Sequence, residues 1–243
     1  KLIDEGNTIP FISRYRKEAT GALNDEQLRD LGERLTYLRN LEDKKAQVIS
    51  SIEEQGKLTE ELKAAIEAAQ TQVAVDDLYR PYRPKRRTRA TMAKEKGLEG
   101  LANIILLQMT TTPLEIEAES YLSEEKGVKN VQEAIAGAMD IIAESISDEA
   151  DYRTWIRNKT LKEGEIISEA KDEKEQSVYE TYYHFSQPIN KMAGHRTLAL
   201  NRGEAEKVLT VKIVAPEPEI LSYLESRVIT KDNSITSPVL EEV

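Results

Sequence analysis

The sequence predicts a mainly α-helical protein, a multi-helical bundle or array with one long helix at about residues 25–55 and a minor β element near residues 207–214. Only 5% of its 243 residues are aromatic, and 32% are charged. Alanine, leucine, glutamate and lysine are abundant, and all four are compatible with helices. Apolar residues also recur every three or four positions, which places them on one face of a helix.

The long helix has both a start and a stop signal. Asn24 and Gln27 resemble a capping pair at its start, and Gly56 suits the left-handed backbone that often follows a helix. Eight apolar residues recur between these signals: Leu28, Leu31, Leu35, Leu38, Leu41, Val48, Ile49 and Ile52. Glu42 and Lys45 interrupt the series where a coiled coil needs apolar side chains, so we expect this helix to pack against its own domain.

Shorter helices are predicted after the long one. Thr59 is the expected N-cap of the first. Thr112 is the expected N-cap of another, with Pro113 at its first helical position. An apolar face predicts a third helix, which ends near Asp148 and carries Val131, Ile135, Ala138, Ile141, Ile142 and Ile146. The only tryptophan, Trp155, follows and is the expected core or interdomain anchor.

The sequence changes character near residue 163, which predicts two parts, residues 1–162 and residues 163–243. Residues 171–176 form a charge run, which we expect to be an exposed connection. Residues 207–214 alternate apolar and polar side chains and are rich in β-branched residues, which predicts a strand. One helix is expected after this strand, and another begins so close to the last residue that we expect the chain to continue beyond it.

Composition excludes several kinds of site. The chain has no cysteine, which rules out a disulfide framework, a thiolate nucleophile and a cysteine-based zinc site. Its only histidines, His184 and His195, are too few for a multi-histidine metal cage. The longest aliphatic run, residues 104–107, is far shorter than the ~20 residues that span a bilayer. We therefore expect a cytoplasmic protein with no membrane partner, no metal and no cofactor.

Residues 79–96 form a basic strap, with eight basic residues and one acidic residue in a chain of net charge −10. A basic segment on an acidic body is typical of a site for a polyanion. Pro81 and Pro84 favour an extended, polyproline-like course through the first half of the strap, with three residues per turn. This course would align side chains along two neighbouring edges, with Arg80, Arg83 and Arg86 on one and Tyr79 and Tyr82 on the other.

The strap provides most of the candidate nucleic-acid-binding residues. Arginine forks suit phosphate oxygens, and tyrosine rings suit stacking on bases. The candidates in the strap are Tyr79, Arg80, Tyr82, Arg83, Lys85, Arg86, Arg87 and Arg89. Arg14, Arg16 and Lys17 would extend this basic surface if they fold near the strap. In a second interpretation the strap wraps the helices, its arginines paired with carboxylates and its tyrosines filling grooves. In a third it docks a protein.

A further cluster runs from His195 to Glu204. A histidine near arginines can act as a general base, but catalysis also needs a nucleophile and an orienting partner, and the sequence offers neither. We therefore expect a structural hydrogen bond at His195. The scattered carboxylates form no catalytic pair and have no metal-ligand spacing. The sequence accordingly predicts a protein that is not an enzyme, and a nuclease or hydrolase is disfavoured.

Four segments together resemble the Tex family of bacterial transcription accessory proteins: Pro10–Gly21, Asp77–Arg89, Gly137–Glu144 and His195–Glu204. The resemblance covers essentially the whole chain, in order. It implies an N-terminal helical region with a helix–turn–helix. In the family a ribonuclease-H-like domain, helix–hairpin–helix motifs and a C-terminal OB-fold domain follow. This chain lacks the OB-fold domain, to which the family's nucleic-acid affinity is largely attributed, so weak binding is expected.

The strap and the resemblance predict a non-catalytic helical scaffold of an RNA-binding transcription accessory protein. The scaffold would bind polyanions, or position downstream domains, through the strap. The expected partners are nucleic acid (RNA or DNA), the transcription machinery and the C-terminal domains of the full-length protein. The alternative is a protein–protein interaction scaffold, contacting RNA polymerase or acting as an intramolecular clamp, with no nucleic-acid binding by this chain.

Overall fold

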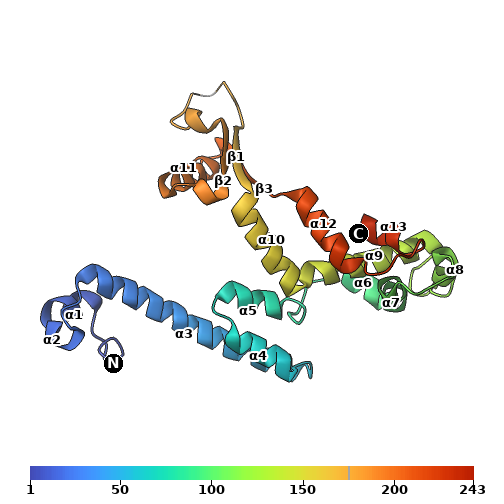
Figure 1. Ribbon diagram of the computed structural model, residues 1–243, viewed down its shortest axis with the longest axis horizontal. Helices are drawn as coiled ribbons and strands as arrows, with labels where there is room; N and C mark the ends of the chain where they lie inside the picture. The colour runs from blue at the N-terminus through green and yellow to red at the C-terminus, as the bar shows by residue number, and fades with distance from the viewer. Residues whose placement is uncertain (175) are drawn as a thin grey trace. The chain divides into compact units, whose positions relative to one another are not determined.

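The computed structural model describes residues 1–174 and 176–243, and it confirms a mainly α-helical fold with a minor β element (Figure 1). The chain divides into two compact units, Lys1–Arg83 and Pro84–Val243. The boundary that the sequence predicts near residue 163 stays a prediction. In the structure that position lies inside the second unit, where a helix ends and a sheet begins.

The first unit is built around its longest helix. Its elements are α1 (Ile9–Tyr15), α2 (Lys17–Thr20), α3 (Asp25–Glu54), α4 (Glu60–Ala68) and α5 (Gln72–Tyr79). The 30 residues of α3, drawn in blue in Figure 1, span about 45 Å. The predicted capping pair is confirmed, because each side chain of Asn24 and Gln27 accepts a hydrogen bond from the other residue's amide, at 2.8 and 3.1 Å. Gly56 ends the helix with a φ of +67°.

α4 and α5 pack on the C-terminal half of α3. The core between these helices consists of Leu41, Val48, Ile52, Ile66 and Val75. Lys45 lies among these residues and is only 9% exposed. Its amine donates to the Glu67 carbonyl in the last turn of α4, at 2.8 Å, and pairs with Glu42, also at 2.8 Å. Lys45, one of the two charged residues that break the apolar series, therefore ties α3 to α4, and the prediction that α3 packs within its own domain is confirmed.

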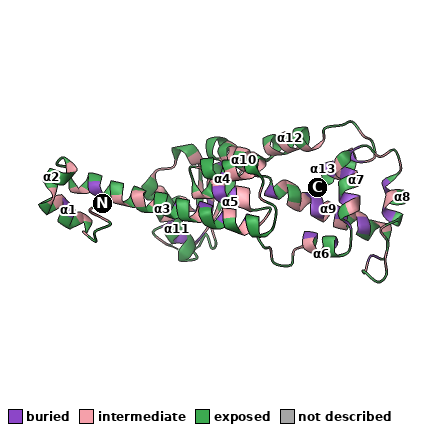
Figure 2. Cartoon of the chain, turned by 90° about the horizontal axis from the view of Figure 1, so that it is seen from below, coloured by how far each residue is buried: buried purple, intermediate pink, exposed green. Residues whose placement is uncertain are grey.

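The second unit is built around α9 (Val131–Asp148). Its other helices are α6 (Arg89–Glu95), α7 (Glu99–Leu107), α8 (Leu114–Glu119), α10 (Ala150–Glu163), α11 (Gly194–Ala205), α12 (Glu217–Val228) and α13 (Ser237–Glu242), with 3-10 turns η1 (Glu180–Tyr182) and η2 (Ile189–Lys191). α6, α7 and α8 pack on α9. The buried residues of α9, purple in Figure 2, include Ala134, Ala138, Ile141 and Ile142. The apolar face predicted for this helix is therefore core.

The start of α8 differs from the prediction. Thr112 does not cap the helix, and Pro113 has an extended backbone (φ −49°, ψ 137°), so the helix begins at Leu114. Thr110 organises this turn instead. Its hydroxyl donates to Glu117 at 2.7 Å and accepts from the Thr112 amide at 3.1 Å. The threonine that stabilises the helix start is therefore two residues earlier than predicted.

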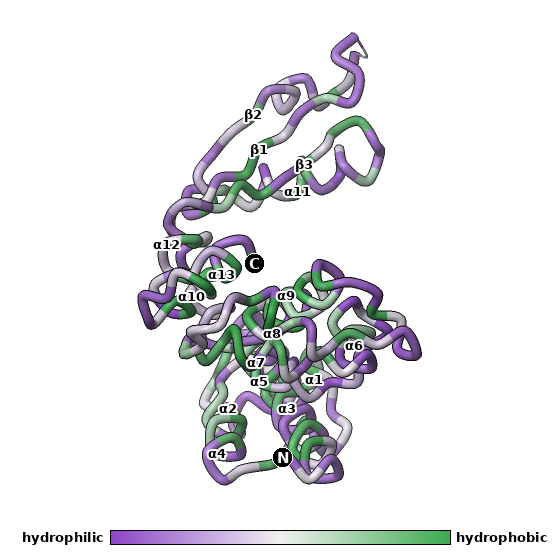
Figure 3. The backbone as a smooth tube through the Cα atoms, turned by 90° about the vertical axis from the view of Figure 1, so that its right-hand side faces the viewer, coloured by the Kyte–Doolittle hydropathy of each residue, from purple (hydrophilic) through white to green (hydrophobic). Residues whose placement is uncertain are grey.

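The sheet has three antiparallel strands in the order β2–β1–β3: β1 (Glu165–Ala170), β2 (His184–Pro188) and β3 (Leu209–Val214). β3 confirms the predicted strand. The sequence does not predict β1 or β2, because β1 has glutamate and alanine near its ends and β2 is short and ends in proline. Figure 3 shows the apolar residues within β1 in green. β1 forms because it pairs with a neighbour on each side.

Trp155 is an anchor inside the second unit. Its ring stacks on Tyr223 with the ring centroids 3.8 Å apart and the planes 3° from parallel. Tyr152 meets the same tyrosine edge-on, with the centroids 6.0 Å apart. Since Trp155 belongs to α10 and Tyr223 to α12, this aromatic stack joins the helix before the sheet to the helix after it.

The charge run at residues 171–176 is an exposed connection over the residues that are described, because residues 171–174 and 176 are exposed. Glu175 lies outside the described residues. None of the helices in the described part of the chain is long and apolar enough to cross a membrane.

Two glycines of α11 give a matched test of packing against the sheet. A methyl group on Gly203 would lie 2.6 Å from Leu209 Cδ1 and 3.2 Å from the Tyr179 ring, whereas one on Gly194 would meet nothing within 4 Å. Overpacking costs roughly 1–3 kcal/mol, and alanine is favoured over glycine in a helix by ~1 kcal/mol. Gly203→Ala should therefore lower the melting temperature while Gly194→Ala leaves it equal or higher, as thermal denaturation can measure. Equal melting temperatures would contradict this packing.

Candidate nucleic-acid interface

The first half of the strap is a turn and not the predicted extended segment. The amides of Tyr82 and Arg83 both donate to the Tyr79 carbonyl at 2.9 Å. Arg80 has helical backbone angles, with φ at −53° and ψ at −43°. Pro81 lacks an N–H group, but neither of these bonds needs one from that residue, so proline is compatible with the turn. The single edge of arginines predicted from an extended course is therefore wrong.

The two tyrosines of the strap take part in the packing of the first unit. The Tyr79 hydroxyl lies 2.9 Å from the Ser51 hydroxyl on α3, and the Gln55 side chain donates to the Tyr82 carbonyl at 3.0 Å. Both rings are half-buried against the core of α3, α4 and α5. This arrangement matches the interpretation in which the tyrosines fill grooves, and it leaves them less available to stack on bases.

Lys85 attaches the second half of the strap to α9. Its amine contacts the carboxylates of Glu144, at 3.3 Å, and Asp148. These three side chains are 23%, 19% and 8% exposed. Asp148 is the last residue of α9, where the carbonyl ends of the helix disfavour a negative charge. The ammonium group of Lys85 offsets that effect, so this residue holds the strap against α9, and its role in nucleic-acid binding stays a prediction.

After Lys85 the chain enters α6 through a capping box. The Thr88 hydroxyl accepts from the Thr91 amide at 3.0 Å, and the Thr91 hydroxyl accepts from the Thr88 amide at 2.7 Å. Arg89, the first residue of α6, directs its Nε toward Asp140 on α9 at 3.3 Å. Arg87 and Glu95 are 4.0 Å apart.

The guanidinium groups of the strap lie at the surface. Five arginines are exposed: Arg80, Arg83, Arg86, Arg87 and Arg89. The side chains of Arg87 and Arg89 are 73% and 83% exposed despite their carboxylate neighbours. Arg83 and Arg86 have no ion pair with any residue that the structure describes. The strap thus combines one half-buried lysine that attaches it with exposed arginines that can meet an anion.

The second basic cluster lies elsewhere in the first unit. Its residues are Arg14, Arg16 and Lys17. α1 packs beside Gly32 of α3, whereas the strap contacts α3 at Ser51, which is about 28 Å further along the helix. Arg16 also donates to Glu18 at 2.9 Å, and this hydrogen bond lowers the pKa of that carboxyl. Within the first unit the cluster is therefore separate from residues 79–83, the part of the strap that this unit contains, and its role in binding stays a prediction.

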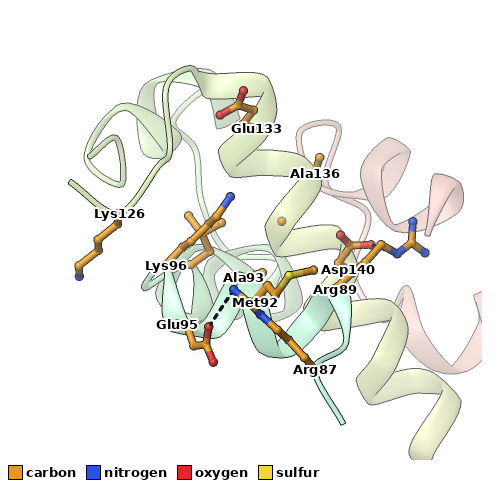
Figure 4. A pocket seen from close by; sticks show the side chains of 12 residues that line it. Arg87, Arg89, Met92, Ala93, Glu95, Lys96, Lys126, Glu133, Ala136 and Asp140 are labelled. Carbon is orange, nitrogen blue, oxygen red and sulfur yellow. Dashed lines mark ion pairs between the residues drawn. The ribbon is translucent and has the colours of Figure 1, made fainter. Parts of the chain in front are cut away.

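A pocket of about 410 Å³ lies beside the second half of the strap (Figure 4). α6, the loop before α9 and α9 itself line it, and its cationic residues are Arg87, Arg89, Lys96 and Lys126. Figure 4 shows these side chains around the pocket. This pocket could not be predicted from the sequence, because Lys126 is about 30 residues from the other cations that line it. The only local signal is Gly127, whose φ of +71° marks a tight turn.

The histidine cluster offers no second site. His195 is exposed near the start of α11, and its side chain has no hydrogen bond to any residue that is described, so the expected structural hydrogen bond is not found. The neighbouring Arg196 does have a structural role, donating to Gln187 of β2 at 2.6 Å. Over the described residues, no three histidine, aspartate or glutamate side chains are grouped to hold a metal ion.

Comparison with protein families gives two matches. Residues 1–53 match the family model described as the Tex-like protein N-terminal domain, and residues 109–236 match the one described as Tex central region-like. The second match alone covers more than half of the chain. The strap lies between the two matched segments.

Curated relatives extend the similarity through the strap. The chain is 47% identical over its whole length to a Bacillus subtilis protein named YdcI. It is 44% identical over 88% of its length to the transcriptional accessory protein Tex of Neisseria gonorrhoeae, and 34% identical over 88% of its length to human S1 RNA-binding domain-containing protein 1. It covers 34%, 28% and 22% of these three proteins, so it spans about a third or less of the relatives that it matches.

Proposed function

The chain belongs to the Tex family, and on this basis we propose that it is a non-catalytic helical scaffold of an RNA-binding transcription accessory protein. One relative is named a transcriptional accessory protein, and another is named for an S1 RNA-binding domain. In this proposal the basic strap contacts the phosphates of a nucleic acid, and each part of the strap is held by the helices of its own unit.

One observation carries the proposal: five arginines between residues 80 and 89 are exposed in a chain of net charge −10. An acidic surface repels nucleic acid, so binding must be confined to a local concentration of cations. Arginine also presents a planar fork of donors to two phosphate oxygens, which the lysines elsewhere on the chain do not. Lys85 of the strap pairs with Glu144 and Asp148, and we assign it to attachment and not to binding.

The dependence of affinity on salt tests the proposal. Each phosphate contact on a single strand contributes ~0.7 to the slope of log affinity against log salt. Three to five contacts predict a slope of about −2 to −3.5. Fluorescence anisotropy with a short labelled RNA and this 243-residue chain measures that slope directly. Failure to bind even at low salt would reject nucleic-acid contact and favour the protein-interaction scaffold.

The same samples test the prediction that the chain is not an enzyme. Labelled RNA and DNA should stay intact when they are incubated with the pure protein and magnesium. Reproducible cleavage that co-purifies with the chain would overturn that part of the proposal.

A further inference from the structure

The pocket beside α6 has an apolar floor. Met92, Ala93, Leu98, Ala136 and Gly137 supply it. Gly137 lets the helices approach closely beneath the pocket, since a methyl group there would lie 2.4 Å from Leu98 Cδ1. The volume of about 410 Å³ falls within the range of small-ligand sites, roughly 300–1,000 Å³. An apolar floor of this kind suits the face of a base or a ribose better than it suits a bare inorganic anion.

The rim of the pocket is charged. Its cations are Arg87, Arg89, Lys96 and Lys126, and its carboxylates are Glu95, Glu133 and Asp140. The cations exceed the carboxylates by one, which matches the single negative charge of one phosphodiester. A nucleoside triphosphate carries several negative charges and would meet three carboxylates.

The cations of the rim have N–H donors that are not used in ion pairs with the described residues. Arg89 uses its Nε toward Asp140, and the four N–H donors on its two terminal nitrogens are not part of that ion pair. Neither Lys96 nor Lys126 has an ion pair with any residue that is described. The Lys126 amine reaches the opposite loop, where a methyl group on Gly97 would lie 3.2 Å from it. The cations beside the apolar floor therefore come from two segments of the chain, residues 87–96 and the loop that contains Lys126 (Figure 4).

We propose that this pocket holds one nucleotide unit of a single-stranded nucleic acid, with the base or ribose on the apolar floor and the phosphate at the cationic rim. The inference rests on the proposed function, because Arg87 and Arg89 belong both to the strap and to the pocket. A nucleic-acid strand bound along the strap could keep its phosphate contacts with these two arginines while one of its nucleotides occupies the pocket. The pocket then adds base or ribose contacts to an interaction that is otherwise electrostatic.

Filling the pocket tests the inference. Ala136 is an exposed residue of α9, so Ala136→Phe should fold while occupying the floor. Gln132→Phe is the matched control, since Gln132 is also exposed, lies one turn earlier on the same helix and does not line the pocket. Stacking of one base contributes ~1–3 kcal/mol, so Ala136→Phe should weaken binding of a labelled oligouridine about tenfold. The salt slope should not change, because the strap still meets the phosphates, and Gln132→Phe should bind like the wild type.

The outcomes separate the two proposals. If the wild type binds oligouridine and Ala136→Phe binds equally well with an unchanged melting temperature, the pocket inference is overturned and the strap proposal stands. If the wild type does not bind, both fail. Lys126→Ala gives a second variant outside the helices, expected to weaken binding about threefold. Uridine monophosphate should compete less well than oligouridine at equal nucleotide concentration, and equal competition would assign the pocket to free nucleotides instead.

Discussion

Lys85→Met is expected to lower the free energy of unfolding of the second unit by about 3 kcal/mol. The substitution removes the cation that faces Glu144 and Asp148 and leaves two mostly buried carboxylates near each other. One of them lies at the C-terminus of α9, where the helix dipole adds to the cost. At about 2–4 °C per kcal/mol for a unit of this size, the melting temperature should fall by about 6–12 °C.

Two variants control the interpretation of this result. Arg86→Ala removes a neighbouring positive charge that is exposed and has no ion pair with a described residue, so it should leave the melting temperature nearly unchanged. Lys85→Met/Asp148→Asn removes the charge at the helix end along with the lysine and should recover part of the loss. A melting temperature for Lys85→Met equal to that of Arg86→Ala would mean that the lysine does not attach the strap.

Replacing three arginines of the strap, in Arg83→Ala/Arg86→Ala/Arg87→Ala, should weaken binding to single-stranded RNA about 30- to 100-fold at low salt. Each exposed ion pair contributes up to ~1 kcal/mol, and each 1.4 kcal/mol corresponds to a factor of ten in affinity. All three side chains are exposed, so the variant should melt like the wild type. Fluorescence anisotropy gives the affinity, and a thermal melt confirms the fold. Unchanged affinity would mean that the strap does not contact the RNA.

Helices with local start and stop signals could be predicted from the sequence. α3 has a capping box at Asn24 and a glycine with left-handed backbone at Gly56. Each of these signals depends only on residues close to it in the sequence. β1 and β2 could not be predicted, because their stability comes from pairing with segments far along the chain. Only β3 has enough β-branched residues to be recognised alone.

In the candidate site, too, features that depend on residues far apart in the sequence could not be predicted. The charge of the site follows from a run of basic residues that has too few acidic neighbours in sequence to neutralise it. The exposure of its arginines could not be predicted, because the same run is compatible with arginines paired to carboxylates of the helices. The course of its backbone could not be predicted from the sequence. The prolines exclude a regular helix, but they are compatible with the turn in which two amides donate to the Tyr79 carbonyl. The role of Lys85 depends on two carboxylates about 60 residues later in the chain, and no pattern within the strap identifies them. The pocket depends in the same way on Lys126.

The salt dependence of RNA binding by the triple arginine variant tests the central claim most directly. A suitable control is Lys171→Ala/Lys174→Ala/Lys191→Ala, which also removes three exposed positive charges but leaves the strap intact. If the strap arginines contact phosphates, the slope of log affinity against log salt should become shallower by about 2 in the strap variant and stay at its wild-type value in the control. A strap variant that keeps the wild-type slope, or a control that loses as much as the strap variant, would contradict this account.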